Sequence, residues 1–168
     1  MNKNYTIAPG SIVEENVVIG DGTRVWYFCH IRSGAKIGQN CVIGDHCYVG
    51  EKVIMGNGVK IGNGVSLYEG LIIKDNVMVG SGATFGNVRF PRAYKKAKRY
   101  ENTIIEEGVT ILQNATIRPG VTVGKGCVIG EGAIVAWDIP EYTHITNPPG
   151  LVRSRITPDK EEKDGKDN

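Results

Sequence analysis

Large aromatic side chains are scarce in this sequence. Phe, Trp and Tyr make up 7% of its 168 residues, whereas 23 residues are glycine. A chain of this length can form one domain with a buried core, but a core built mainly from large rings and leucines is excluded. We expect a repetitive arrangement of smaller side chains in its place.

The sequence also lacks an excess of charge and a long apolar run. Lys and Arg number 20 against 18 Asp and Glu, which argues against a protein that neutralises nucleic acid or anionic lipid. No apolar run approaches the roughly 20 residues of a membrane span, and MNKNYTIAPG lacks the basic-then-apolar pattern of a signal peptide. We therefore expect a cytoplasmic protein with neither nucleic acid nor membrane as a partner.

A six-residue repeat occupies most of the chain. It reads IAPGSI, VEENVV, IGDGTR and so on from Ile7 to FGNVRF, stops after Phe90, and returns at Ile105 with IEEGVT. All 20 hexapeptides begin with Ile, Val, Leu, Met or Phe, and the fourth residue is Gly in eleven and Asn in four. Gly and Asn adopt a positive φ most easily. The pattern predicts short strands joined by tight corners, with the first and fifth residues facing inward.

The repeat resembles that of the hexapeptide-repeat proteins. The resemblance implies an all-β fold, a left-handed parallel β-helix in which three hexapeptides form one coil and the coils stack about 4.8 Å apart. Residues 18 apart in the sequence would then be vertical neighbours. We expect one β-helix domain over residues 1–156 with an inserted loop at 91–104, followed by a charged tail at 157–168 that is disordered.

All four cysteines occupy the small fifth position of a hexapeptide. They are Cys29, Cys41, Cys47 and Cys127, and no C-x-x-C motif occurs. A zinc site or a disulfide framework would not follow the repeat. The sequence therefore predicts buried reduced thiols, with Cys29 and Cys47 stacked in adjacent coils.

Hexapeptides that break the pattern are candidates for function. VWYFCH places Phe28 at a corner and His30 at an outward position, where its imidazole could accept a proton from a nucleophile. FGNVRF places Val88 at a corner and Arg89 at a normally inward position. The inserted loop that follows is rich in cations, which suits a clamp for phosphate or carboxylate, although a merely solvated loop is the alternative. Its cations are Arg92, Lys95, Lys96, Lys98 and Arg99.

The spacing of 18 also predicts two columns of side chains. An apolar stripe of Ile54, Ile72 and Phe90 should be covered by a neighbouring subunit or by the loop. In the second, polar column, the carboxylates of Glu51 and Glu69 would lie close together and oppose each other's ionisation. That column needs a cationic neighbour or a ligand such as an amine, or else screening by solvent and by Lys52 or Arg92. Its members are Glu15, Ser33, Glu51, Glu69 and Asn87.

Three segments of the sequence resemble one particular group of hexapeptide-repeat enzymes. VWYFCHIRSGAKIG, NGVSLYEG and FGNVRFPRA are similar to those of the nucleotide-sugar 3-N-acetyltransferases, except that Tyr27 replaces a His and Gly86 replaces a Thr. The resemblance implies an enzyme that transfers the acetyl group of acetyl-CoA to the 3-amino group of a nucleotide-linked aminosugar, in the synthesis of cell-surface polysaccharide precursors such as lipopolysaccharide O-antigen. It also implies a homotrimer with sites between subunits, and no metal.

The same resemblance assigns roles to individual residues. Asn87 would orient the amine, Glu69 would hold the sugar, and His30 would be a supporting polar group or a base. Substrate binding falls to Tyr68, Arg32 and Arg92. The acetyl-CoA is expected along the C-terminal coils, at Ala115, Ala133, Pro148 and Arg153.

Several alternatives stay open. Arg32, Arg89 and Arg92 favour a sugar with a C6 carboxylate, a UDP-2-acetamido-3-amino-2,3-dideoxyglucuronate, and a dTDP-3-amino-3,6-dideoxyhexose is the other choice. A zinc-dependent γ carbonic anhydrase would need three converging histidines, two of them five residues apart, whereas His30 and His46 are 16 apart. A non-catalytic scaffold is the third possibility.

Overall fold

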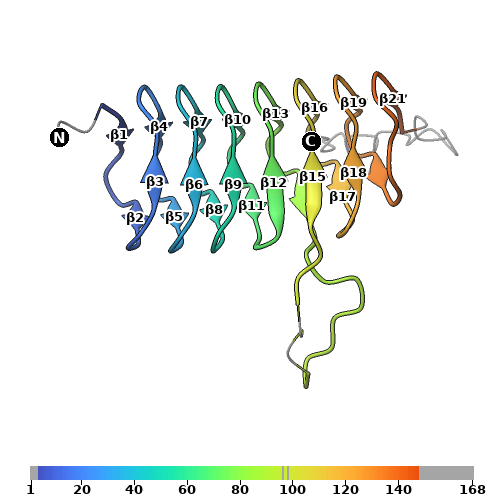
Figure 1. Ribbon diagram of the computed structural model, residues 1–168, viewed down its shortest axis with the longest axis horizontal. Helices are drawn as coiled ribbons and strands as arrows, with labels where there is room; N and C mark the ends of the chain where they lie inside the picture. The colour runs from blue at the N-terminus through green and yellow to red at the C-terminus, as the bar shows by residue number, and fades with distance from the viewer. Residues whose placement is uncertain (1–3, 96, 98, 148–168) are drawn as a thin grey trace, which may run out of the picture.

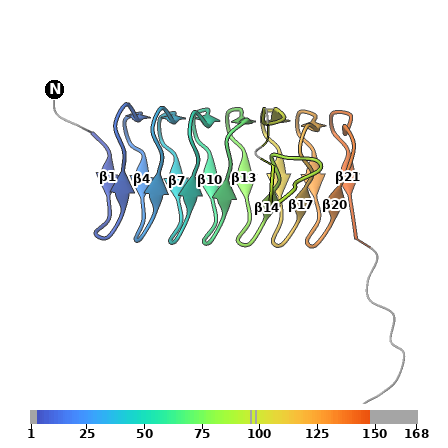
Figure 2. The ribbon, with the colours of Figure 1, turned by 90° about the horizontal axis from the view of Figure 1, so that it is seen from below.

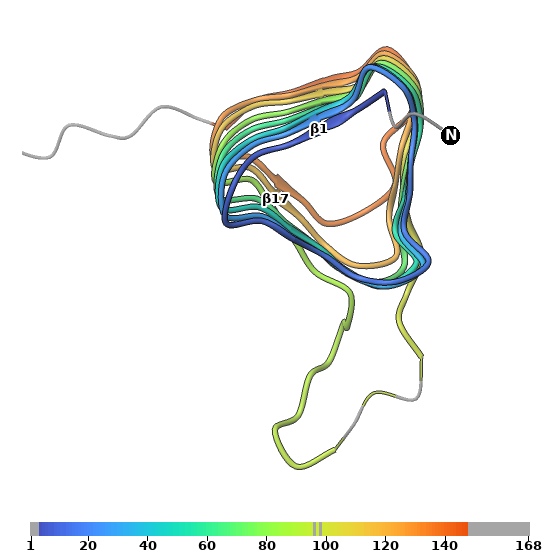
Figure 3. The same ribbon diagram turned by 90° about the vertical axis from the view of Figure 1, so that its left-hand side faces the viewer.

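The computed structural model describes residues 4–95, 97 and 99–147. This part of the chain contains 21 short strands and no α-helix, and hence no helix able to cross a membrane. The strands form three parallel sheets, which are the faces of a triangular prism (Figures 1 and 3). The predicted all-β fold, a left-handed parallel β-helix of hexapeptide repeats, is confirmed, with about 8 turns.

Each face takes every third strand. Face 1 contains β1 (Thr6–Ile7), β4 (Arg24–Val25), β7 (Val42–Ile43), β10 (Lys60–Ile61), β13 (Met78–Val79), β16 (Thr110–Ile111), β19 (Val128–Ile129) and β21 (His144–Ile145). Face 2 contains β2 (Ile12–Val13), β5 (His30–Ile31), β8 (Tyr48–Val49), β11 (Ser66–Leu67), β14 (Thr84–Phe85), β17 (Thr116–Ile117) and β20 (Ile134–Val135). Face 3 contains β3 (Val18–Ile19), β6 (Lys36–Ile37), β9 (Ile54–Met55), β12 (Leu71–Ile73), β15 (Thr103–Ile105) and β18 (Thr122–Val123).

The coils stack in the predicted register. On face 2, His30 pairs with both Ile12 and Tyr48, which lie 18 residues before and after it. Ile72 pairs with Ile104 because the chain between β14 and β15 leaves the prism as a long loop. Figure 2 shows the coils side by side at regular spacing. Side chains at equivalent positions of successive coils are therefore neighbours.

The first and fifth residues of the hexapeptides form the core, as predicted. From Thr23 onward these residues are buried in every regular coil, and they are mostly Val, Ile, Ala and Cys. All four cysteines are free and buried. Cys29 Sγ donates to the Gly44 carbonyl at 3.0 Å, and Cys47 Sγ donates to the Gly62 carbonyl at 3.1 Å, one coil further on. Burial raises the pKa of the Cys41 thiol, which keeps it protonated.

The corners have the backbone conformation that the fourth residue predicts. Eleven glycines and the four asparagines Asn16, Asn40, Asn76 and Asn114 have a positive φ. Phe28 and His46 also occupy corners, with φ of 57° and 56°. The aromatic side chains of VWYFCH therefore project outward, and Trp26, Tyr27 and Phe28 are 45%, 44% and 60% exposed.

The inserted loop corrects three details of the sequence analysis. It comprises residues 86–102, so Thr103 and Ile104 of the predicted insertion 91–104 belong to β15 instead. Arg89 is exposed rather than inward, because the chain has already left the prism at that point. Phe90 is 75% exposed on the loop, and Ile104 continues the stripe of Ile54 and Ile72 in its place.

Gly64 gives a test of the corner geometry. Its φ is +71° and a Cβ atom there would meet no other atom within 4 Å, so a substitution measures backbone strain alone. We expect Gly64→Val to lower the free energy of unfolding by about 1–2 kcal/mol. Gly64→Asn should cost much less, because Asn76 has the same conformation with φ 57°. Urea unfolding of the two variants would contradict this account if it gave equal losses.

Candidate functional site

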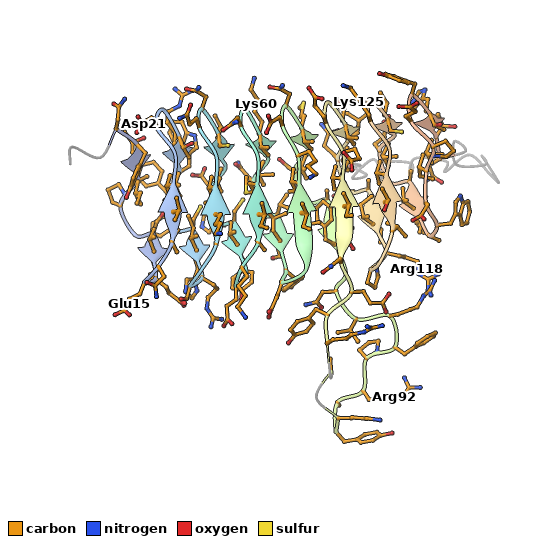
Figure 4. All side chains as sticks on the ribbon, in the orientation of Figure 1. Glu15, Asp21, Lys60, Arg92, Arg118 and Lys125 are labelled. Carbon is orange, nitrogen blue, oxygen red and sulfur yellow. The ribbon has the colours of Figure 1, made fainter. Side chains whose placement is uncertain are left out.

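The candidate residues lie along one edge of the prism. We name as the loop edge the line where the chain passes from face 2 to face 3, at residues 14–17, 32–35, 50–53, 68–70, 86–102, 118–121 and 136–138. Figure 4 shows Glu15 and Arg118 on the side of the prism from which the loop carrying Arg92 hangs, with Asp21, Lys60 and Lys125 on the opposite side. The repeat thus gathers residues that are far apart in the sequence.

Glu14 is the centre of a polar cluster at the N-terminal end of this edge. Its Oε1 lies 2.8 Å from His30 Nε2 and 2.7 Å from Arg32 Nε. Its Oε2 accepts the backbone N–H of Ser33 at 2.9 Å. The Arg32 guanidinium and the Ser33 N–H hold the pKa of Glu14 at about 2, well below its usual value of 4.5. The carboxylate is therefore ionised at neutral pH.

Arg32 binds two carboxylates at once. Besides Glu14, its NH2 group lies 2.6 Å from Glu51 Oε1, and its NH1 group donates to the Tyr48 hydroxyl at 3.3 Å. These contacts, with Glu14 first and Tyr48 second, raise the pKa of Arg32 further above its usual value. The cation that the sequence analysis assigned to substrate is thus already neutralised within the protein.

His30 faces outward, as predicted, but one of its nitrogens is committed. Since an ionised carboxylate only accepts hydrogen bonds, the Nε2 of His30 carries the proton that faces Glu14. In neutral imidazole this leaves Nδ1 as the unprotonated nitrogen. The ring meets Tyr48 edge-on at 5.9 Å between centroids, and Tyr48 lies 5.8 Å from the Tyr68 ring. Tyr68 thereby joins the cluster.

Glu69 and Asn87 lie one coil apart at the base of the loop. Lys52 Nζ lies 3.7 Å from Glu69 Oε1, so Lys52 and Arg32 supply the cationic neighbours that the paired carboxylates Glu51 and Glu69 require. The Asn87 carbonyl accepts the Glu101 N–H at 3.1 Å, which closes the loop at its base. Both Glu69 and Asn87 are half-buried, so their polar groups are accessible from the edge.

A cavity of about 500 Å³ lies between the loop and the prism. It combines apolar walls with charged groups from both sides. Its lining residues are Lys52, Ile54, Glu69, Gly70, Leu71, Ile72, Ala97, Arg99, Tyr100 and Asn102. The loop thus covers part of the apolar stripe of face 3, one of the two covers that the sequence predicts.

The loop itself is cationic and exposed. A second cavity of about 380 Å³ is formed within it by residues that include Phe90, Arg92 and Lys95. Arg92 donates to the Pro91 carbonyl at 3.0 Å and contacts no carboxylate within the described part of the chain. Lys96 and Lys98 lie outside the described residues.

Two of the residues assigned to the acetyl-CoA site, Ala115 and Ala133, do not belong to the loop edge. Ala115 and Ala133 are 0% and 2% exposed in the core, so a coenzyme at these positions would contact the backbone of the coil rather than the two side chains. Their place in the acetyl-CoA site stays a prediction. Their small size serves the interior of the coil. Pro148 and Arg153, together with the predicted tail, lie outside the described residues.

The sequence analysis missed Glu14, Tyr48 and the pairing of Arg32. The sequence spacing could have revealed this pairing. Glu14 and Arg32 are 18 residues apart and therefore stack, and each directly precedes a member of the polar column, Glu15 or Ser33. The departure at Gly86 also has a structural reason, since a Cβ there would lie 2.9 Å from the Pro119 ring. Among residues 4–95, 97 and 99–147, no group of three or more His, Cys, Asp or Glu side chains could hold a metal ion.

Acidification tests the role of Glu14. Its lowered pKa means that the carboxylate stabilises the fold fully above pH 4.5, and that this stabilisation is lost as the pH falls from 4.5 through about 2. We expect Glu14→Gln to unfold at lower temperature than the wild type at pH 7, with the difference shrinking toward pH 2. Glu15→Gln, which changes an exposed neighbour, is the control and should follow the wild-type curve. Equal behaviour of the two variants would contradict the geometry described for Glu14.

Comparisons with solved structures identify proteins of the same fold. The N-acyltransferase AntD from Bacillus cereus, solved with dTDP and 3-hydroxybutyryl-CoA, has a TM-score of 0.59 at 21% identity, with 92% of this chain and 84% of that chain covered. A UDP-N-acetylglucosamine acyltransferase from Campylobacter jejuni has a TM-score of 0.50 at 17% identity, covering 83% of this chain and 70% of that chain. Identities this low show a shared fold. Comparison with curated proteins gives no match.

Sequence models of protein families identify the repeat itself. The model described as bacterial transferase hexapeptide, with six repeats, matches residues 16–51, 52–87 and 102–136. The model described as the hexapeptide repeat of succinyl-transferase matches residues 34–69. The three matches of the first model cover more than half of the chain and leave out residues 88–101 of the inserted loop. The chain therefore belongs to the bacterial transferase hexapeptide family and is an acyltransferase.

Proposed function

We propose that this acyltransferase transfers the acetyl group of acetyl-CoA to the 3-amino group of a nucleotide-linked aminosugar. The observation that carries the proposal is the position of Glu69 and Asn87, one coil apart at the base of a cationic loop, with Glu69 lining the cavity that the loop covers. A carboxylate suits an amine or a sugar hydroxyl, and loop cations suit the diphosphate of a nucleotide.

The transfer needs positioning more than a strong base. The lone pair of the amine nitrogen attacks the thioester carbonyl carbon, a C–N bond forms, and the C–S bond breaks. The proton lost by the nitrogen passes to the departing thiolate, which leaves as the thiol. In this proposal Asn87 orients the amine and Glu69 binds the sugar, whereas His30 belongs to the polar cluster and lies two coils before Glu69.

The residues present on the C-terminal part of the loop edge suit the coenzyme. Arg118 is exposed and makes no ion pair with another described residue, and Trp137, one coil beyond it, is 67% exposed. A guanidinium suits the phosphates of CoA and an indole suits its adenine ring. Pro148 and Arg153 remain proposals for the same end of the molecule. AntD, which shares the fold, was solved with a nucleotide and an acyl-CoA.

The proposal includes a cytoplasmic homotrimer. Ile54, Ile72 and Ile104 form an apolar column on face 3, with Ile54 43% exposed. The inserted loop covers this column only in part. A monomer seldom leaves the remainder open to water, and three prisms packed face to face would cover it. The proposed substrate for the loop edge is a nucleoside diphosphate sugar with an amine at C3. Both classes of sugar left open by the sequence, with and without a C6 carboxylate, have these two features.

Substitution of Asn87 tests the proposed chemistry. We expect Asn87→Ala to lower kcat for acetyl transfer by about 10- to 1000-fold, the range for loss of one positioned polar group, with little change in the affinity for acetyl-CoA. Thiol release from acetyl-CoA with a panel of UDP- and dTDP-linked 3-aminosugars measures the rate. Calorimetry with CoA measures the binding.

His30→Asn tests the competing mechanism, in which His30 is the base. Loss of a general base costs about 10²–10⁴-fold and changes the pH profile, whereas we expect a smaller effect because Nε2 is bound to Glu14. The control is His46→Asn, since His46 is exposed at a corner where Asn is readily accommodated. Abolished activity in His30→Asn with a silent Asn87→Ala would replace the proposed roles by base catalysis.

The oligomeric state is a separate prediction. Sedimentation equilibrium should give three times the 18.2 kDa mass of one chain. Ile72→Glu places a carboxylate in the apolar column and should shift the equilibrium toward monomer, while Lys60→Glu, on face 1, should leave the mass unchanged. A fully active monomer would remove the intersubunit site from the proposal.

A further inference from the structure

The carboxylates of the loop edge continue beyond Glu69 at a residue that the spacing of 18 does not identify. Across the inserted loop the register changes from 18 to 32 residues, because Leu71 pairs with Thr103. The same step carries Glu69 to Glu101. A Cβ atom at Gly70 would lie 2.7 Å from the Glu101 carbonyl oxygen, and the Thr103 N–H donates to the Gly70 carbonyl at 3.0 Å. Glu101 therefore stacks on the coil of Glu69.

Glu101 and Asn87 share one corner of the prism. The chain leaves face 2 at Asn87 and returns toward face 3 at Glu101. The Glu101 N–H donates to the Asn87 carbonyl at 3.1 Å, so the two residues are adjacent although the whole loop separates them in the sequence. The residues on either side of Glu101, Tyr100 and Asn102, line the 500 Å³ cavity together with Glu69. The amide assigned to the sugar amine therefore has a carboxylate-bearing residue beside it.

The Glu101 side chain points toward the next coil. A Cβ atom at Gly120 would collide with Glu101 Oε2, so the carboxylate occupies space that is open only because residue 120 has no side chain. The Gly120 N–H donates to the buried Thr103 hydroxyl at 3.0 Å, which fixes the glycine in place. Arg118, proposed for the coenzyme, belongs to the same coil as Gly120. The Glu101 carboxylate thus lies between the places proposed for the amine and for the thioester.

Glu101 is also a carboxylate without a cationic partner. Glu14, Glu51 and Glu69 each contact a cation of the prism. Glu101 is half-buried, yet it forms no ion pair with another residue in the part of the chain that the structure describes. A partly buried charge is costly unless a bound group supplies a positive charge or a hydrogen-bond donor. Of the groups on the proposed substrate, the amine can do so, whereas a phosphate or a sugar carboxylate would be repelled.

We propose that Glu101 is a further catalytic residue: its carboxylate accepts a hydrogen bond from the C3 amino group and stabilises the positive charge that develops on the nitrogen. The inference rests on the proposed function and adds a residue to the same site. As the amine attacks the thioester carbonyl carbon, the C–N bond forms and the nitrogen becomes positively charged, until the C–S bond breaks and the proton passes to the departing thiolate. Glu101 gains no proton in this step, so it acts through its charge and not as a base.

Glu101→Gln removes the charge and keeps the shape of the side chain. We expect kcat for acetyl transfer to a nucleotide-linked 3-aminosugar to fall by about tenfold or more, with little change in the affinity for CoA measured by calorimetry. Glu106→Gln is the matched control and should keep the wild-type kcat. Glu106 is also half-buried and without an ion pair among the described residues, but it lies on the edge between faces 3 and 1.

The outcomes for the inference and for the proposed function are distinct. An unchanged kcat in Glu101→Gln, with acetyl transfer by the wild type, would overturn the inference and leave the proposed function intact. Transfer by the wild type to none of the UDP- and dTDP-linked 3-aminosugars would remove the proposed function, and the inference with it.

Chemical rescue separates a direct role of the carboxylate from a structural one. Glu101→Ala leaves open space beside Gly120, which is exposed, so a small carboxylate such as formate can enter. We expect formate to raise the activity of Glu101→Ala by about fivefold or more and to leave that of Asn87→Ala unchanged. A loss of activity in Glu101→Ala that formate does not restore would assign the effect to structure and overturn the catalytic role.

Gly120→Ala moves the carboxylate without replacing it, and decides the inference if Glu101→Gln does not fold. The added Cβ atom would displace Glu101 Oε2, so kcat should fall by about tenfold or more. Gly108→Ala controls for backbone strain, because the φ of Gly108 is +70° against +80° for Gly120, and a Cβ atom at Gly108 would meet nothing within 4 Å. Equal kcat values in the two glycine variants would contradict the proposed role of Glu101.

Discussion

The stacking of identical six-residue steps is the constraint on which the rest of the structure depends. Each coil can bury its first and fifth residues only against the next coil, at a spacing of about 4.8 Å. The inward residues must therefore be small or β-branched, and each corner must turn within one residue of positive φ. The side chains that bear chemistry occupy positions that are neither inward nor at a corner. Not all of these positions can vary, because a Cβ at a second-position glycine such as Gly38 or Gly56 would collide with the next coil.

The same stacking converts sequence spacing into spatial contact. Glu14 and Arg32 meet because they occupy the same position in successive coils, and Arg32 then reaches Glu51 in the following coil. The long loop leaves the prism at this edge, between Asn87 and Glu101, without disturbing the register, because Ile72 pairs with Ile104 as Ile54 pairs with Ile72. An insertion at a corner changes the surface while the core remains continuous.

The fold could be predicted from the sequence almost completely, down to the corner at Phe28, because one local rule repeats in every coil. The site was predictable only where it follows that rule. The column of Glu51 and Glu69 could be placed, but the choice by Arg32 of Glu14 and Glu51 depends on side-chain direction, which spacing does not determine. Phe90 and Arg89 were misplaced because the repeat carries no information once the chain has left the prism.

The order of groups along the loop edge fits the proposed acetyl transfer. Glu51, Glu69, Asn87 and Pro119 occupy successive coils, so the edge from the carboxylates to Arg118 spans about 14 Å. From the N-terminal to the C-terminal coils, the edge carries first the carboxylates with their paired cations and then Asn87 and the cationic loop. The unpaired Arg118 and the exposed Trp137 lie at its C-terminal end. A sugar held at the first region and a thioester arriving from the last would meet at Asn87.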